Sequence, residues 1–161
     1  MRSQTKQNRV RNTAVSALCV LLLAACGDSP ESMISSAKEY MAKNDRNAAS
    51  IQLKNALQKN PALAEARFLL GKVNYEQGDY AGAEKELSRA LDGGYAADQV
   101  VPLLAQAMLS SGQGQRLITE LASKELTQPE AKASLLTSVG FAELQQDRKS
   151  TRLNSSHAGL S

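Results

Sequence analysis

The stretch that decides the fold is AEARFLLGKVNYEQGDYAGAEKELSRAL, which runs from Ala64 to Leu91. Its first half carries apolar residues at helical spacing, and Gly78 and Asp79 separate it from the second half. Glycine accepts the positive φ of a tight chain reversal, and an aspartate side chain can cap the helix that follows it. Strong helix formers such as Ala, Leu, Glu and Lys fill most other positions. The stretch therefore predicts a helix–turn–helix hairpin.

The same pattern recurs along the chain with a period of 34 residues. The segment Ala48–Leu57 aligns with Gly82–Leu91, and Asp45 aligns with Asp79. A column of small residues follows the period closely: Ala37, Gly71, Ala105 and Gly140. We expect these small residues to let neighbouring helices approach closely, because a larger side chain would clash. Periods of this length are typical of stacked helical repeats.

The residues in the central unit resemble the tetratricopeptide repeat (TPR) consensus. The matching positions are Leu70-Gly71, Tyr75, Gly78-Asp79-Tyr80, Ala83 and Ala90-Leu91, whereas Arg67 replaces the usual tryptophan. The resemblance implies an all-α solenoid of about 3.5 helix–turn–helix repeats after an N-terminal signal helix. We place the repeat domain at residues 33–146, with units at 30–63, 64–97 and 98–131 and a partial unit at 132–146.

The resemblance also implies a binding surface, because first helices of such repeats line a concave groove that holds peptides. The predicted lining residues are Ile34, Lys38, Met41, Phe68, Lys72, Tyr75 and Gln106. Lys38 and Lys72 are 34 residues apart, so we expect them to stack along the groove. They either pair with an acidic ligand or are simply solvated, and the sequence leaves both alternatives open. The paired Lys/Asn clamp that chaperone-binding repeats use is not present.

The N-terminus resembles a bacterial lipoprotein signal. Four basic residues and no acid precede an apolar run at 13–25, which is too short to span a bilayer. Leu23-Ala24-Ala25-Cys26-Gly27 resembles a lipobox, in which the cysteine is acylated. We therefore predict a signal peptide at 1–25, lipidation of Cys26 and a tether at 26–32, with outer-membrane export implied by Gly27. The alternatives are a buried N-terminal helix and a chance cysteine at an ordinary cleavage site.

The C-terminal segment 147–161 breaks the repeat abruptly. Its first eleven residues, DRKSTRLNSSH, resemble the in-frame translation of a common sequencing-library adapter. We therefore interpret 147–161 as a disordered tail of artefactual origin, and the alternative is a genuine polar tail. The only histidine of the chain, His157, lies within this segment and is expected to carry no function.

The rest of the sequence argues against catalysis. Residues 1–146 contain no histidine, which excludes Ser/His and Cys/His pairs, and no CxxC or HExxH metal motif occurs. Residues 26–146 hold 12 basic and 15 acidic residues, a net charge of −3 that does not favour nucleic-acid binding. We predict that the protein is not an enzyme and uses no cofactor or metal. Its expected partners are proteins or peptides in the groove and a membrane reached through acylated Cys26.

Residues 14–146 are similar to one family in particular. The lipobox, LKNALQKNP at 53–61 and GGYAADQVVPLLAQAM at 93–108 resemble the TPR lipoproteins of the PEP-CTERM/exosortase system (PrsT-type). That resemblance implies an N-terminal fragment of a longer scaffold that acts near exopolysaccharide export from the outer membrane, facing the periplasm. Two alternatives remain: a TPR lipoprotein of another envelope machine, such as barrel assembly or type IV pilus biogenesis, and the non-catalytic front of a truncated larger enzyme.

Overall fold

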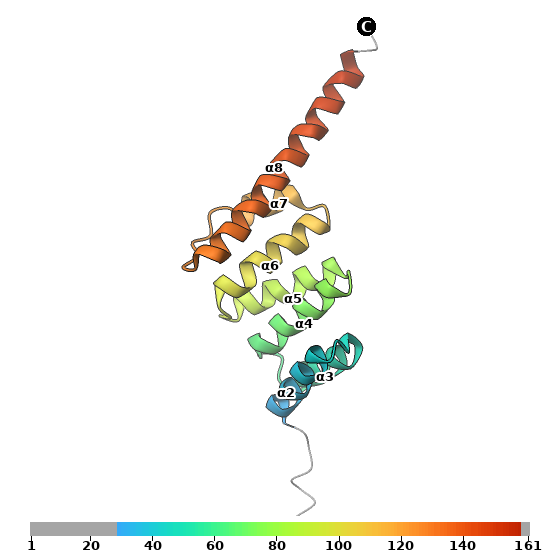
Figure 1. Cartoon of the computed structure of the whole chain (residues 1–161), viewed down its shortest axis with the longest axis vertical. Helices are drawn as coiled ribbons and strands as arrows, with labels where there is room; N and C mark the ends of the chain where they lie inside the picture. Colours follow the sequence, from blue (N-terminus) through green and yellow to red (C-terminus); the bar gives the residue numbers. More distant parts are fainter. Residues whose placement is uncertain (1–28, 159–161) are drawn as a thin grey trace, which may run out of the picture.

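The computed structural model describes residues 29–158, with side chains described to residue 151. All regular structure within these residues is α-helical, and the helices stack one above another along the long axis (Figure 1). The predicted signal peptide, Cys26 and the start of the tether lie outside the described residues. The predicted all-helical solenoid of the repeat region is therefore confirmed for the part of the chain that is described.

The first six described helices form three helical hairpins. α2 (Pro30–Ala42) pairs with α3 (Arg46–Lys59), α4 (Ala64–Glu76) pairs with α5 (Tyr80–Asp92), and α6 (Ala97–Ser110) pairs with the short α7 (Gly114–Leu121). α8 (Pro129–Ala158) then packs on α6 and α7 and extends beyond the stack (Figure 1). Each of the seven helices thus touches its neighbours in sequence order, as expected for a quasi-one-dimensional array.

The turns form for the reasons that the sequence indicated. Asn44, Gly78 and Gly112 have φ values of 58°, 81° and 76°, so the reversal within each of the three hairpins uses the left-handed region. Asp45 Oδ1 accepts a hydrogen bond from the Ala48 amide at 3.0 Å, and Asp79 Oδ1 accepts one from Gly82 at 2.9 Å. In the third hairpin Gln113 stands before α7 and provides no side-chain cap. The second helix of this hairpin, α7, has only eight residues and is the shortest helix in the described part of the chain.

The core consists of two clusters that Phe68 joins. The first cluster lies around α2, α3 and α4 and includes Leu53 and Val73, which are fully buried. The second extends from α5 to α8 and includes Leu87 and Met108. Phe68 packs against both clusters. The stack therefore has one continuous apolar interior, although each unit could bury only part of its apolar face alone.

Arg67, which replaces the consensus tryptophan, connects three elements through polar contacts. Its guanidinium donates to the Pro61 carbonyl at 2.6 and 3.0 Å and to Glu86 Oε2 at 2.8 Å. The Arg67 and Glu86 side chains are only 16% and 11% exposed. A charge-assisted, half-buried contact of this kind fixes geometry more firmly than a surface ion pair. Arg67 thus links the turn after α3 to α5.

The last helix differs from the prediction at both ends. α8 begins at Pro129, three residues before the start of the partial unit predicted at 132–146, because proline is well suited to the first turn of a helix. It also continues through 147–158, where we expected a disordered tail. Extending an existing helix costs little compared with nucleating a new one. The Ser150 and Thr151 hydroxyls also donate to the Asp147 carbonyl at 2.9 and 2.8 Å within this segment.

Candidate binding surface

The predicted groove residues lie on the first helices of successive hairpins, at positions related by the 34-residue period. Ile34 and Phe68 are equivalent, as are Met41 and Tyr75, and a third series comprises Lys38, Lys72 and Gln106. Ile34 is buried, the two lysines are exposed, and the other four are half-buried. Met41 packs on the first core cluster and Tyr75 on the second. The lysines are therefore the members of the set most available to a ligand.

Lys38 has a partner within the chain. Its Nζ lies 2.6 Å from Glu65 Oε1, so α2 and α4 are joined by an ion pair on this surface. The hydrogen bond from Lys38 to Glu65, together with the attraction of the carboxylate, raises the lysine pKa above its usual range. The pair borders a depression of about 230 Å³ that is also lined by Ile34, Ser35 and Leu63. An acidic ligand at Lys38 would have to displace Glu65.

Lys72 is different, although it is the exact repeat equivalent of Lys38. No ion pair joins Lys72 to another side chain within the described residues. The repeat explains this difference, because Glu31 and Glu65 are 34 residues apart and the next position in the series is Gln99. The carboxylate that would pair with Lys72 is replaced by a neutral amide. An exposed cation is therefore left on the surface between α4 and α6.

Two aromatic residues complete this surface. Phe68 stacks on Tyr95, with ring centroids 4.6 Å apart and an interplanar angle of 19°. Burial raises the pKa of the Tyr95 phenol, and the nearby Glu65 carboxylate adds to this effect. We had not predicted Glu65 or Tyr95 as surface residues. The recurrence of Glu31 at Glu65 was a usable signal for the first, whereas nothing local in the sequence indicated the second.

Further along the stack, Gln106 faces α8. Its Nε2 donates to Ser134 Oγ at 3.3 Å, so the residue equivalent to Lys38 and Lys72 in the third hairpin contacts the next helix.

The predicted packing residues fall into two groups, of which only the first is closely packed. Ala37 and Ala105 are fully buried, and a Cβ on Gly71 would lie 2.7 Å from Leu87 Cγ. Gly140 does not pack in this way, because a Cβ there would have no neighbour within 4 Å.

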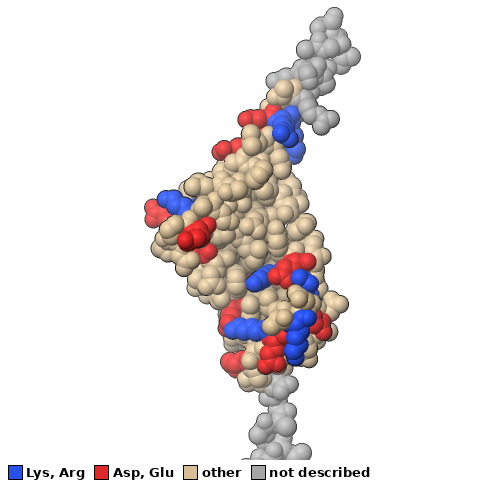
Figure 2. Space-filling view, viewed as in Figure 1, with Lys and Arg blue, Asp and Glu red and all other residues tan. Residues whose placement is uncertain are grey.

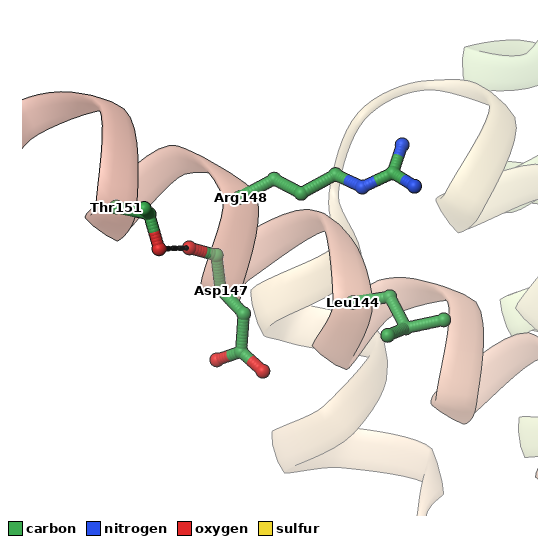
Figure 3. Close-up of a pocket in the computed structure, with 4 residues that line it drawn as sticks. All are labelled: Leu144, Asp147, Arg148 and Thr151. Atoms are coloured by element: carbon green, nitrogen blue, oxygen red, sulfur yellow. Dashed lines mark hydrogen bonds between the residues drawn. The ribbon is translucent and has the colours of Figure 1, made fainter.

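A concavity on the projecting part of α8 has a different character. It has a volume of about 430 Å³ and is lined by Leu144, Asp147, Arg148 and Thr151, all from this single helix (Figure 3). The only contact drawn among them is the hydrogen bond from the Thr151 hydroxyl to the Asp147 carbonyl. Because one helix supplies every wall, the described residues do not enclose a ligand here.

The charge distribution agrees with a surface of mixed sign. Figure 2 shows lysine and arginine interspersed with aspartate and glutamate over the lower helices, while the centre of this face is largely uncharged.

Among the described residues no group of three or more His, Cys, Asp or Glu is placed to hold a metal ion. No helix in the same part of the chain has both the length and the apolar character needed to cross a bilayer.

Comparison with known proteins agrees with the repeat analysis. A TPR repeat family model matches residues 37–78, which span most of the first hairpin and α4. No curated protein matches the chain. The matched segment contains the reversal at Asn44, the cap at Asp45 and the small residue Gly71, which are the features that shape the hairpins. Together, the family match and the stacked helical hairpins support membership of the tetratricopeptide repeat superfamily.

Proposed function

We propose that the protein is a non-catalytic scaffold that binds protein partners on the surface formed by α2, α4 and α6. TPR repeats are typically protein-interaction modules, which supports this proposal. The observation that carries it is the ordered series of equivalent side chains on successive first helices, with one exposed lysine that has no ionic partner on the described surface. A rigid array of this kind presents contacts at fixed intervals. Little conformational entropy of the site is therefore lost when a partner binds.

The chemistry of this surface favours an acidic segment of the partner near Lys72. The Phe68–Tyr95 stack provides an apolar platform beside the first two hairpins, and Gln99 and Gln106 provide amide groups on the third. A carboxylate at Lys72 would meet a positive charge with no competing acid, whereas at Lys38 it would compete with Glu65 at 2.6 Å. We therefore assign the electrostatic contact of the partner to Lys72 rather than to both lysines.

The setting that we propose is the bacterial envelope. The lipobox-like sequence ending at Cys26 supports acylation and anchoring, since several buried acyl chains give stable membrane attachment. The resemblance to PrsT-type lipoproteins supports a role beside the exosortase system and exopolysaccharide export, at the outer membrane and facing the periplasm. In this setting the repeats would hold components of the export apparatus near the membrane.

The anchoring part of the proposal is tested by Cys26→Ser. We expect this variant to leave the outer-membrane pellet and to appear in the soluble periplasmic fraction, with a melting curve of the repeat domain like that of the parent. Metabolic labelling with a fatty acid should mark the parent and not the variant. Recovery of the variant in the outer-membrane pellet would reject the lipid anchor.

The binding part is tested by Lys72→Glu. Partners captured by cross-linking in the envelope and identified by mass spectrometry should be lost or strongly reduced in this variant. The matched control is Lys54→Glu, because Lys54 is an exposed lysine on α3, outside the proposed surface. Equal loss in both variants would indicate a general charge effect, and unchanged capture in Lys72→Glu would reject the proposed contact.

A further inference from the structure

The helix α8 has two apolar sides, and only one is covered. Leu135, Val139 and Ala142 are buried against the preceding helices. On the opposite side Leu136, Gly140 and Leu144 follow one another at intervals of four residues and therefore share one face of the helix. Leu136 and Leu144 are each 57% exposed, and the flanking Phe141 is 55% exposed. We call Leu136, Gly140, Phe141 and Leu144 the open face of α8.

α2 and α8 differ in the polarity of their exposed side chains. The exposed positions of α2 include Glu31, Ser35, Lys38 and Glu39, so the first end is polar, as expected for the cap of a repeat array. Among the described residues, three of the four exposed large hydrophobic side chains lie on α8, and the fourth is Ile51 on α3. An apolar cluster at one end of a solenoid is typical of an interaction surface rather than of a solvated cap.

The open face is symmetric about its glycine. Leu136 lies four residues before Gly140 and Leu144 lies four residues after it. If a second α8 crosses antiparallel with the two glycines adjacent, each Leu136 meets Leu144 of the other copy. A glycine at the crossing point allows the two helix backbones to approach closely, and no described residue lies within 4 Å of its Cβ position. This is the self-complementarity that a two-fold interface requires.

The charges along α8 favour the same antiparallel arrangement in this chain, although Asp147 and Arg148 belong to the segment 147–161 that we interpret as artefactual. Glu130 and Lys132 lie near the beginning of the helix, and Asp147 and Arg148 lie at a similar distance beyond Gly140. In the antiparallel arrangement Glu130 of one copy and Arg148 of the other lie at nearly the same level along the helix axes. Lys132 of one copy likewise lies near the level of Asp147 of the other. At ~1.5 Å per residue these offsets are only ~2–3 Å, within reach of long side chains. A parallel arrangement would instead place each charge beside its own copy.

From these observations we propose that the open face of α8 binds a second copy of this chain, forming a two-fold antiparallel dimer around Gly140. The position of α8 fits this proposal, because the helix packs on α6 and α7 along one side and projects beyond them (Figure 1). The two solenoids would then extend in opposite directions, leaving α2, α4 and α6 of each copy away from the interface. The proposal concerns the chain that includes residues 147–161 and does not depend on the proposed groove.

The first test is the mass of the full chain in mild detergent, measured by light scattering from ~10 µM to ~1 mM, the range in which small interfaces associate. We expect a monomer at the low end and a dimer at the high end. Leu144→Glu should remain monomeric throughout. The matched control is Ile51→Glu, since Ile51 is 58% exposed and Leu144 is 57% exposed. A parent chain that stays monomeric, or association that persists in Leu144→Glu, overturns the proposal.

A charge exchange gives the sharper test. Glu130→Arg and Arg148→Glu should each weaken dimerisation about tenfold, because two ion pairs per dimer become repulsive contacts. The double variant should return the dissociation constant to within about twofold of the parent. The two positions are ~27 Å apart along one helix, so this restoration can arise only between copies. Circular dichroism of each variant checks that α8 remains helical. Additive weakening in the double variant would overturn the antiparallel arrangement.

Discussion

Helices α4 and α8 both carry the repeat glycine, but they differ in what covers it. Above Gly71 lies α5, with Leu87 so close that a Cβ would come within 2.7 Å of its Cγ atom. Around the Cβ position of Gly140 no atom of the described residues lies within 4 Å. A small residue at this position of the repeat therefore allows a second helix to pack closely. The effect of enlarging it on the free energy of unfolding depends on whether that second helix is present. The same substitution should therefore have opposite effects at the two sites.

The largest effect is expected from Gly71→Leu. The added side chain would overlap Leu87 and press on the α5 backbone, where Leu87 N is already 3.2 Å from the Cβ position. Overpacking of this severity should destabilise the fold by about 4 kcal/mol. A thermal melt followed by circular dichroism should show the midpoint fall by more than about 10 °C.

The matched control for that substitution is Gly140→Leu, measured at a concentration where the chain is monomeric. Replacing a mid-helix glycine at an uncrowded position should stabilise the helix by up to about 1 kcal/mol. An unchanged melt in Gly71→Leu would contradict the packing argument. Similar destabilisation in both variants would mean that a neighbour also covers Gly140.

The covering helix itself provides the second prediction. Leu87 is fully buried, whereas Leu144 on α8 is 57% exposed. Leu87→Ala should cost about 3 kcal/mol, because it removes apolar contacts and leaves a cavity above Gly71. Leu144→Ala should change the free energy of unfolding by less than about 0.5 kcal/mol. Chemical denaturation of both variants checks this contrast. Equal losses in the free energy of unfolding would show that Leu144 is as well covered as Leu87.

Much of this architecture was predictable from the sequence. The period of 34 predicted the all-helical stack, and the reversals at Asn44, Gly78 and Gly112 follow from residues that tolerate positive φ. The caps at Asp45 and Asp79 follow from side-chain chemistry that acts within three residues. These features are local, so a single sequence contains all the information that they need.

The features that sequence reasoning missed depend on partners distant in sequence. Lys38 was expected either to pair with an acidic ligand or to be solvated, but the next unit provides Glu65 as its ionic partner. Gly140 was expected to pack like Gly71, but α8 has no covering helix among the described residues. The end of α8 was also missed, because helix propagation across 147–158 depends on a preceding helix that is already anchored.

Arg67 provides a third comparison between the same two helices. When Gly71 and Gly140 are aligned, Arg67 of α4 corresponds to the exposed Leu136 of α8. Arg67→Ala should cost about 2 kcal/mol, since it leaves the buried Glu86 carboxylate without its closest cation. The matched control is Arg46→Ala, whose ion pair with Glu76 has side chains 39% and 33% exposed. Thermal melts should show a clear loss for the first variant and almost none for the second.

A smaller effect is expected where α8 is attached to the stack. Asp98 in the first turn of α6 accepts hydrogen bonds from the Thr127 amide at 2.8 Å and the Gln128 amide at 3.1 Å, and from the Thr127 hydroxyl. These hydrogen bonds, with that of the hydroxyl largest, lower the Asp98 pKa below its usual range. A carboxyl with a depressed folded pKa contributes stability that is fully present above its unfolded pKa of about 3.9 and is lost as the pH falls through the lower folded value.

Asp98→Asn should therefore lower the melting temperature slightly at about pH 7, and the difference from the parent should shrink as the pH approaches about 2. Asp92→Asn, at the exposed end of α5, serves as the control because it leaves the contacts of Asp98 intact. Because Asp98 holds the residues that lead into α8, hydrogen exchange should increase at the start of α8 in the variant before it increases in α4. A difference that stays constant with pH would mean that the carboxylate charge does not secure this junction, so that apolar contacts alone would hold α8 to the stack.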